Sequence, residues 1–358
     1  MRVLGIDPGT LSIDLCGLED GEPFFDLTLP TAEALRDPRV LLELLRSLGP
    51  LDLVAGPSGY GLPLVPARAA TDEDLRLAAL APAGSSGGLG GLRALMQALA
   101  DAPTAVVFTP GVIHLPSVPP FRKCNRVDMG TADKVCAAAL AIDEQMQMRR
   151  CGPADVSFVL VELGGAFTAV LAVEGGRIVD GLGGSAGPMG ARAAGALDGE
   201  LAFLIGTVTK GHLFDGGAQS IAGTPGAEWL HLDTPAARFA REAYIDGVVK
   251  GVAAMLVSLP EPRAILLSGR LSQANALADP ILNRLRARWP RCDAGLLGSR
   301  SNGSKHAAQG AALLADGLAG GRHAPLVDRL GIRDAAGTVL DHLHVITRQA
   351  ARARLGLS

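Results

Sequence analysis

The chain is poor in aromatic residues, and its few cysteines follow no metal-binding or disulfide pattern. Aromatics make up 4% of the 358 residues, and the five cysteines include no C-x-x-C pair. An odd number of scattered cysteines excludes a disulfide framework and a zinc ribbon, and it is typical of a reducing compartment, so we expect a cytoplasmic protein. No apolar run approaches ~18 residues and the first one is too short for a signal peptide, so we expect neither a membrane partner nor secretion.

An excess of one charge sign is also lacking. The net charge is −3 and charged residues are 19% of the chain, which argues against a nucleic-acid partner bound through bulk charge. Hydrophobic residues reach 48%, enough for a large core. The 46 glycines and 23 prolines indicate many tight turns or a close approach of backbone to a ligand. The length favours two domains or lobes.

The first 30 residues predict a three-stranded meander, with strands over 2–7, 12–18 and 23–29. The first strand ends in the sequence Asp7-Pro-Gly9-Thr10. A similar pattern returns later, with strands over 159–163, 168–173 and 177–182. A shift of 155 residues places Glu162 on Asp7 and Gly164 on Gly9 without a gap, so we interpret the two meanders as a structural duplication.

The rest of the chain alternates between helical and strand patterns, which predicts a mixed α/β protein. Further strands are expected over 51–55, 105–108 and 264–267, and helices over 35–48, 72–80, 91–100, 130–150, 235–258, 273–288 and 304–319. We divide the chain into a first lobe at 1–150, a second lobe at 151–322 and a basic tail at 323–358 with one helix near its end. Asp128 is the expected N-cap of the helix over 130–150, which would cross between the lobes.

The end of each meander's first strand combines a carboxylate with glycine. Asp7 could hold a magnesium ion or its waters, while backbone N–H groups near Gly9 and the Thr10 hydroxyl could take phosphate oxygens. Glu162, with Gly164 and Gly165, would supply a second such turn. The plainer alternative is an ordinary hairpin turn, in which Asp-Pro-Gly is common.

A third glycine turn, Ser268-Gly269-Arg270, follows a strand and precedes a helix. Glycine there would let a base or ribose lie against the backbone, and the plain alternative is a βα loop.

Together these stretches resemble a known superfamily. Gly5-Ile-Asp7-Pro-Gly9-Thr10, Glu162-Leu-Gly164-Gly165 and Leu267-Ser-Gly269-Arg270 look like the phosphate-1, phosphate-2 and adenosine motifs of the acetate and sugar kinase/Hsp70/actin superfamily. Within it, residues 125–134 and 179–188 resemble an uncharacterised family labelled as predicted butyrate kinases. The resemblance covers roughly residues 1–320, and it departs at Glu162, where the superfamily usually has Asp.

The resemblance implies two ribonuclease-H-like lobes, an actin-like ATPase fold, closing on ATP and Mg²⁺. It implies a kinase that transfers the γ-phosphoryl of ATP to a small acceptor, with a short-chain organic acid as the first choice. The resemblance implies that the catalytic residues are Asp7, Glu162, Asp128 and Arg192, and that Asp7 and Glu162 also hold the metal. The residues implied for ATP binding are Gly9, Thr10, Gly164, Gly165, Gly269 and Arg270. Those implied for acceptor binding are Arg122, Arg126 and Thr131. The plain alternatives are a solvated basic loop at 122–126 and an exposed helix charge at Lys134. The sequence leaves open whether the protein forms a homodimer.

Other functions compete with this one. The stretch 183–187 matches the G-x-S-x-G elbow of hydrolases, but it follows the return arm of a meander. The stretch 298–305 nearly makes a P-loop, but Ser304 and Lys305 stand in the wrong order and no apolar strand clearly precedes it. The stronger competitor is an ATP-driven conformational switch or activator on the same fold, acting without a small-molecule acceptor.

Overall fold

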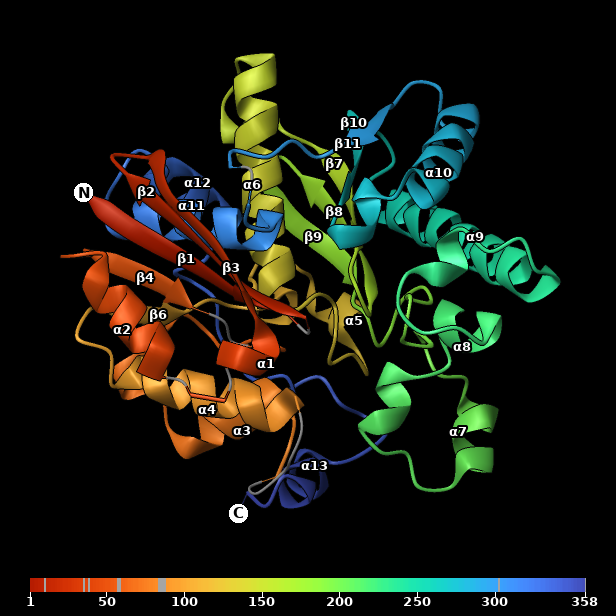
Figure 1. Ribbon diagram of the computed structural model, residues 1–358, viewed down its shortest axis with the longest axis horizontal. Coiled ribbons are helices and arrows are strands. Elements are labelled where there is room, and N and C mark those ends of the chain that lie inside the picture. Colours follow the sequence, from red (N-terminus) through yellow and green to blue (C-terminus); the bar gives the residue numbers. More distant parts are fainter. Residues whose placement is uncertain are drawn as a thin grey trace.

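The computed structural model describes residues 1–9, 11–34, 36–37, 39–56, 59–82, 88–301 and 303–357, with residues 88–91 described by their backbone alone. Two mixed β-sheets with covering helices form the two halves of the molecule, and a central helix stands between them (Figure 1). This arrangement confirms the predicted two-lobed α/β architecture.

The first sheet has six strands in the order β3-β2-β1-β4-β6-β5. They span Arg2–Pro8 (β1), Ser12–Glu19 (β2), Glu22–Pro30 (β3), Leu53–Gly56 (β4), Val65–Pro66 (β5) and Val106–Phe108 (β6). Its helices are α1 (Thr31–Ala34), α2 (Arg39–Ser47), α3 (Asp72–Ala79) and α4 (Gly88–Ala100). The strand β1 pairs antiparallel with β2 and parallel with β4, so the residues that end β1 emerge from the middle of the sheet.

The second sheet has five strands in the order β11-β10-β7-β8-β9. They span Phe158–Leu163 (β7), Thr168–Glu174 (β8), Arg177–Leu182 (β9), Ala264–Ser268 (β10) and Asp293–Leu296 (β11). The helices of this half are α7 (Gly199–Ile205), α8 (Ala218–Ala222), α9 (Pro235–Ser258) and α10 (Asn275–Arg288). The short α5 (Pro120–Lys123) precedes the central helix α6 (Ala132–Arg149).

The strand β7 is covered on both faces, which explains its unbroken apolar sequence. Val159 and Val161 belong to the core that includes Tyr244 of α9. Phe158 and Leu160 alternate with them and belong to the core formed with α6. Side chains of a strand point alternately to its two faces. Glu162, near the end of β7, therefore points to the same face as Phe158 and Leu160, toward α6.

The first hairpins of the two sheets share one register under the predicted 155-residue shift. Asp7 pairs with Asp14 in the first sheet, and Glu162 pairs with Ala169 in the second. Each of these partners lies 155 positions from its counterpart, so the acid occupies the same place in both hairpins.

The second hairpins of the two sheets, β2 with β3 and β8 with β9, share an irregularity in their strand pairing. The register of β2 with β3 shifts between Gly17 and Leu18, and that of β8 with β9 shifts between Ala172 and Val173. A bulge is a local kink that ordinary pairing does not require. Its presence at equivalent positions supports the interpretation of the two meanders as a duplication.

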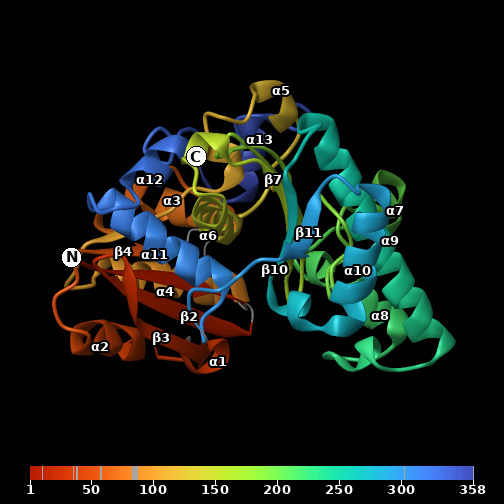
Figure 2. The ribbon, with the colours of Figure 1, turned by 90° about the horizontal axis from the view of Figure 1, so that it is seen from above.

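Two helices form the centre of the molecule: α6 and α11 (His306–Leu318) (Figure 2). They pack closely through small residues, and a Cβ added at Gly310 of α11 would lie 1.7 Å from the carbonyl oxygen of Cys136. On its other side α11 lies against β1, where a Cβ added at Gly5 would lie 2.2 Å from the carbonyl oxygen of Ala308. The helix α11, which we assigned to the second lobe, thus packs on the first sheet; the boundaries at 150 and 322 stay predictions.

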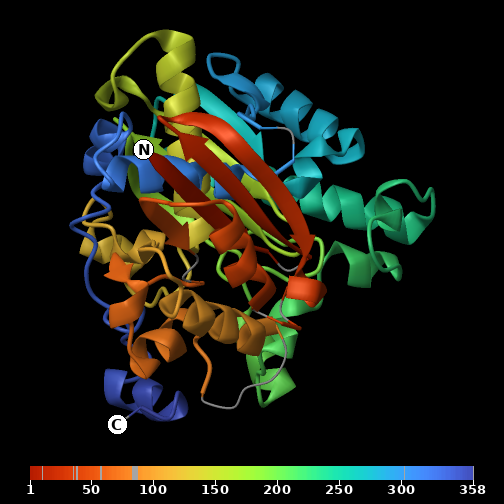
Figure 3. The ribbon, with the colours of Figure 1, turned by 60° about the vertical axis from the view of Figure 1, so that its left-hand side comes forward.

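The last residues return to the first half of the molecule. The helix α12 (Ala324–Leu330) follows α11, and α13 (Arg348–Arg354) is the expected helix near the C-terminus. Figure 3 shows this end of the chain below the orange helices of the first half, where Arg352 forms two bonds of 2.5 and 3.0 Å with Glu73 of α3. Over the described ranges, none of the helices combines the length and apolarity needed to span a bilayer.

The contact between α6 and α11 predicts a specific loss of stability. Gly310→Ala should lower the free energy of unfolding by about 1–3 kcal/mol or more, because the methyl group would overlap the backbone of α6. Gly199→Ala is the matched control, since it is also helical and an added Cβ there meets nothing within 4 Å. Urea unfolding measures both, and equal effects would contradict the close packing of the two helices.

Candidate functional site

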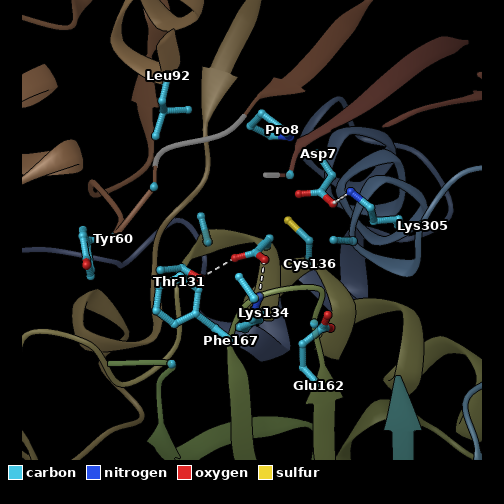
Figure 4. Close-up of a pocket in the computed structure, with 18 of the residues that line it drawn as sticks. Asp7, Pro8, Tyr60, Leu92, Thr131, Lys134, Cys136, Glu162, Phe167 and Lys305 are labelled. Atoms are coloured by element: carbon cyan, nitrogen blue, oxygen red, sulfur yellow. Dashed lines mark hydrogen bonds and ion pairs between the residues drawn. The ribbon is translucent and has the colours of Figure 1, made fainter. Parts of the chain in front are cut away.

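A cavity of about 250 Å³ lies between the two halves of the molecule, and the residues that end β1 and β7 face it from opposite sides. Asp7 extends into it from the first sheet and Glu162 from the second, with Lys134 and Cys136 of α6 between them (Figure 4). The structure therefore brings the two acidic turns to one space.

The glycine of each turn makes the same backbone contact. The N–H of Gly9 donates to the carbonyl oxygen of Ser12 at 2.8 Å, and the N–H of Gly164 donates to that of Phe167 at 3.0 Å. These pairs are again equivalent under the 155-residue shift. A Cβ at Gly164 would lie 2.7 Å from the Phe167 oxygen, so the tight turn admits no side chain there.

Asp7 is buried and faces a lysine. Its Oδ2 lies 3.6 Å from the Nζ of Lys305, which also forms an ion pair of 2.7 Å with Asp14, the cross-strand partner of Asp7. Burial raises the pKa of Asp7 to about 6, and the charges of Asp133 and Asp14 act in the same direction against those of Lys305 and Lys134. The carboxylate would therefore gain from a further cation at this place.

Lys134 lies in the first turn of α6, among carboxylates. Its ammonium donates to Asp133, which also accepts from the hydroxyl of Thr131. Burial alone would lower the pKa of Lys134, but Asp133, Glu162 and Asp7 together raise it above its ordinary value. This lysine therefore carries a positive charge between the two acidic turns at neutral pH.

Glu162 is held by the loop that follows β10. The hydroxyl of Ser268 donates to its Oε2 at 2.9 Å. Gly269 has φ +87°, and a Cβ there would lie 2.6 Å from Glu162 Oε1, so glycine is required for this approach. Arg270 lines the cavity and donates to the hydroxyl of Ser12 at 3.0 Å, which bonds the second half directly to β2 of the first.

Asp128 joins the loop before α6 to the loop after β9. Its Oδ2 accepts from both the backbone N–H and the hydroxyl of Ser185 at 2.9 Å, and its Oδ1 accepts from the N–H of Gly130 at 3.1 Å. The expectation that Asp128 caps the long helix is wrong, because Thr131 is the N-cap of α6. Asp128 instead fixes two loops that border the cavity.

The cavity also has apolar lining, and Figure 4 shows Tyr60 and Leu92 on the side away from Asp7 and Lys305 and Phe167 close to Lys134. Tyr60 and Leu92 line it from the first half, and Phe167 and Phe214 from the second. The two phenylalanine rings pack edge to face, with 4.8 Å between their centroids. Burial and the charge of Asp128 raise the pKa of Tyr60 to about 12, so its hydroxyl stays protonated.

The structure places some predicted site residues in the cavity and others elsewhere. Those that line it are Asp7, Gly9, Asp128, Thr131, Glu162, Gly164, Gly165 and Arg270. Thr10 lies outside the described residues.

The three arginines predicted for the acceptor and for catalysis do not line the cavity. Arg122 donates to the carbonyl oxygen of Val179 at 2.7 Å and lies 3.7 Å from Asp180, so its guanidinium holds β9. Arg126 is exposed. The guanidinium of Arg192 lies 6.0 Å from the ring centroid of Phe214, which belongs to the apolar lining.

Sequence reasoning missed the two lysines of the charged end. An exposed helix charge is the plain alternative for Lys134, but its side chain is only 12% exposed. The available signal was its place in the first turn of the long helix, directly after Asp133. Lys305 was set aside with the incomplete P-loop, yet it comes directly before α11 and contacts Asp7.

The competing glycine motifs lack the surroundings that their chemistry needs. The stretch 183–187 follows β9, an edge strand, and the hydroxyl of Ser185 is bonded to Asp128. The stretch 298–305 follows β11, which has the weakly apolar sequence Asp-Ala-Gly-Leu, and Ser304 and Lys305 stand in the wrong order for a P-loop.

Acetate and propionate kinases are among the solved structures with a similar fold. An acetate kinase from Entamoeba histolytica shares 11% identity over 80% of this chain and 87% of that one, with a TM-score of 0.58. A propionate kinase from Francisella tularensis subsp. tularensis SCHU S4 shares 12% identity over 87% and 98%, with a TM-score of 0.61. An acetate kinase from Porphyromonas gingivalis shares 12% over 87% and 98%, with a TM-score of 0.60.

These similarities show that the chain has the two-lobed, actin-like α/β fold of these structures. A search of curated proteins finds no match. A protein family matches residues 5–345, nearly the whole sequence. The chain therefore belongs to the family described as "Protein of unknown function (DUF1464)".

Proposed function

We propose that this protein is an ATP-dependent phosphotransferase that transfers the γ-phosphoryl group of ATP to a small organic acid. The observation that carries the proposal is the convergence of two equivalent acid–glycine turns, one from each half, on a cavity that also holds two lysines. Phosphoryl transfer depends mainly on positioning and on neutralising charge, and this arrangement suits both needs.

The charged end of the cavity would bind the phosphates. Backbone groups of the turns at Gly9 and at 164–165 would lie along the triphosphate, and Thr10 would stand beside the first of them. Lys134 and Lys305 supply fixed positive charges there. The loop of Gly269 and Arg270 would lie near the adenosine.

The donor set fits a magnesium ion. Over the parts of the chain that the structure describes, no three histidine, cysteine or acidic side chains form a metal-holding group. Magnesium does not need one, because it usually takes one or two carboxylates and keeps water and phosphate oxygens as its other ligands. Asp7 and Glu162 would hold it, and the raised pKa of Asp7 indicates a carboxylate that a cation would stabilise. When bound, the ion would neutralise charge on the phosphate oxygens.

The acceptor would lie between the phosphates and the apolar lining. A carboxylate oxygen would form a bond to the γ-phosphorus while the bond from that phosphorus to the β–γ bridging oxygen breaks. The products would be an acyl phosphate and ADP, and no proton has to leave the acceptor. Leu92, Phe167 and Phe214 would pack on its carbon chain. The resemblance to predicted butyrate kinases and the carboxylic acids named for the structural neighbours support this class of acceptor.

Asp128 would act as a positioning residue, because three hydrogen bonds already occupy its carboxylate. Asp128→Ala should lower the free energy of unfolding by about 1–3 kcal/mol, because three donors lose a charged acceptor. Ser185→Ala removes only one of these bonds and should cost less. The double variant should lose less than the sum of the two, as thermal unfolding can measure. Additive losses would contradict the coupling of the two loops.

Replacing the first acid tests the phosphate site. Asp7→Asn should reduce ADP release from ATP by at least about 10²-fold with the fold intact, because the neutral amide cannot hold a cation at the phosphates. A coupled assay of ADP measures turnover, and circular dichroism checks folding. Asp246→Asn on α9, whose acid forms an exposed ion pair with Lys250, is the matched control and should leave turnover unchanged. Normal turnover in Asp7→Asn would exclude the assigned role.

A panel of acceptors distinguishes the kinase from the switch. With ATP and Mg²⁺, short-chain organic acids should increase ADP release, and hydroxylamine should trap the acyl phosphate as a hydroxamate in equal amount. ATP turnover that is indifferent to every acid, hydroxy acid and sugar would contradict phosphotransfer and favour an ATP-driven switch.

A further inference from the structure

We propose, on the basis of the function proposed above, that the acceptor carries a second anionic group at its far end and that Lys210 and Arg192 bind this group. The acceptor class would then be a dicarboxylic acid or a related acid with two anionic ends. The argument depends on where the cavity places its positive charges and on which of them already have partners.

Lys210 is the first of the two cations. Its ammonium lies 5.0 Å from the ring centroid of Tyr60, which belongs to the apolar lining of the cavity. The side chain is half-buried, and within the described ranges its ammonium makes no hydrogen bond and no ion pair. The other four lysines all have polar partners: Lys123 with Leu115, Lys134 with Asp133, Lys250 with Asp246 and Lys305 with Asp14.

Arg192 is the second cation, and it is also unpaired among the described residues. Its guanidinium lies over the ring of Phe214. Within the described residues no ion pair joins it to the nearby acid Asp215, whose Oδ1 accepts from the hydroxyl of Ser220 at 2.6 Å and the N–H of Gly216 at 2.7 Å, although the two charges attract each other at longer range. Phe214 ends the short helical turn that begins directly after Lys210, and each cation lies next to an aromatic ring that lines the cavity.

A half-buried cation that forms no ion pair with the protein gains from an anion on a ligand. Burial lowers the pKa of Lys210 to about 8, although Asp128 acts in the opposite direction, which shows that the protein itself does not fully compensate this charge. The contact with Tyr60 is a weak cation–π interaction, which a rotation of the flexible lysine side chain can exchange for a carboxylate. Lys210 does not itself line the cavity, so this rotation is part of the proposal.

The positions of the charges set the form of the acceptor. Lys134 and Lys305 lie at the phosphate end of the cavity. Tyr60, whose ring contacts the ammonium of Lys210, lies at the opposite end (Figure 4). Apolar side chains lie between them. A monocarboxylate would engage only the phosphate end, whereas an acid with two anionic ends would engage both.

Matched pairs of acids test this inference. Butyrate and succinate have the same number of carbons, as do pentanoate and glutarate, and hydroxamate formation reports the phosphorylation of each. For the wild-type protein, kcat/KM should be at least about tenfold higher for the diacid, because its second carboxylate gains a charged hydrogen bond. Lys210→Met and Arg192→Met should remove most of this preference. The KM for ATP, measured for each variant, reports whether the phosphate end of the cavity is intact.

Controls separate binding from structure. Lys250→Met removes an exposed lysine on α9 and should keep the preference for the diacid. Lys210→Glu should reverse the specificity, so that 4-aminobutyrate becomes a better acceptor than succinate. A merely structural role of Lys210 would not produce this reversal.

The outcomes distinguish the two proposals. If the wild-type protein phosphorylates monoacids and gains nothing from a second carboxylate, this inference is overturned and the proposed function stands. The same holds if Lys210→Met and Arg192→Met keep the preference. A protein that phosphorylates no acid of either kind overturns both.

Discussion

The shared register of the two β-hairpin pairs is the constraint on which the site depends. A strand's side chains alternate between its faces, so a slip of one residue in either hairpin would turn its acid to the other face of the sheet. The pairing of Asp7 with Asp14 and of Glu162 with Ala169 excludes such a slip. Both carboxylates therefore emerge where their sheets face each other, and α6 and α11 fill the space behind them.

The two halves are equivalent in backbone but not in charge. The partner of Asp7 is a second acid, Asp14, and Lys305 pairs with both. The partner of Glu162 is Ala169, and a hydroxyl from Ser268 takes the place of the lysine. The first sheet therefore holds a lysine and a second acid where the second sheet has a hydroxyl and an alanine. We interpret the duplicated β-hairpins as the feature that positions the two acids. We interpret the residues that differ between the two halves as the feature that orients the phosphates.

Local patterns were enough to predict most of the fold. Both meanders, their acidic turns and their equivalence could be predicted, because alternating apolar residues and glycine turns act over a few positions. The strands β5 and β11 could not, since β5 has two residues and β11 has the weakly strand-like sequence Asp-Ala-Gly-Leu. Such strands form because a neighbouring strand offers them hydrogen bonds, which no local pattern contains.

The site was predicted less completely, for the same physical reason. The acids and glycines of the turns line the cavity, because the turn itself places them. The cations depend on tertiary packing: Arg122 looked suited to an acceptor but holds β9, while Lys134 looked exposed and is buried between the two turns. Lys210 reaches Tyr60 from a segment 150 residues away, a proximity that single-sequence reasoning had no means to find.

The most direct measurement is a crystal structure of the protein with Mg²⁺ and a non-hydrolysable ATP analogue. The account predicts a single triphosphate between the turn at Gly9 and the turn at Gly164, with the ion facing both Asp7 and Glu162. A nucleotide bound outside this cavity, or an ion that faces neither acid, would contradict the account.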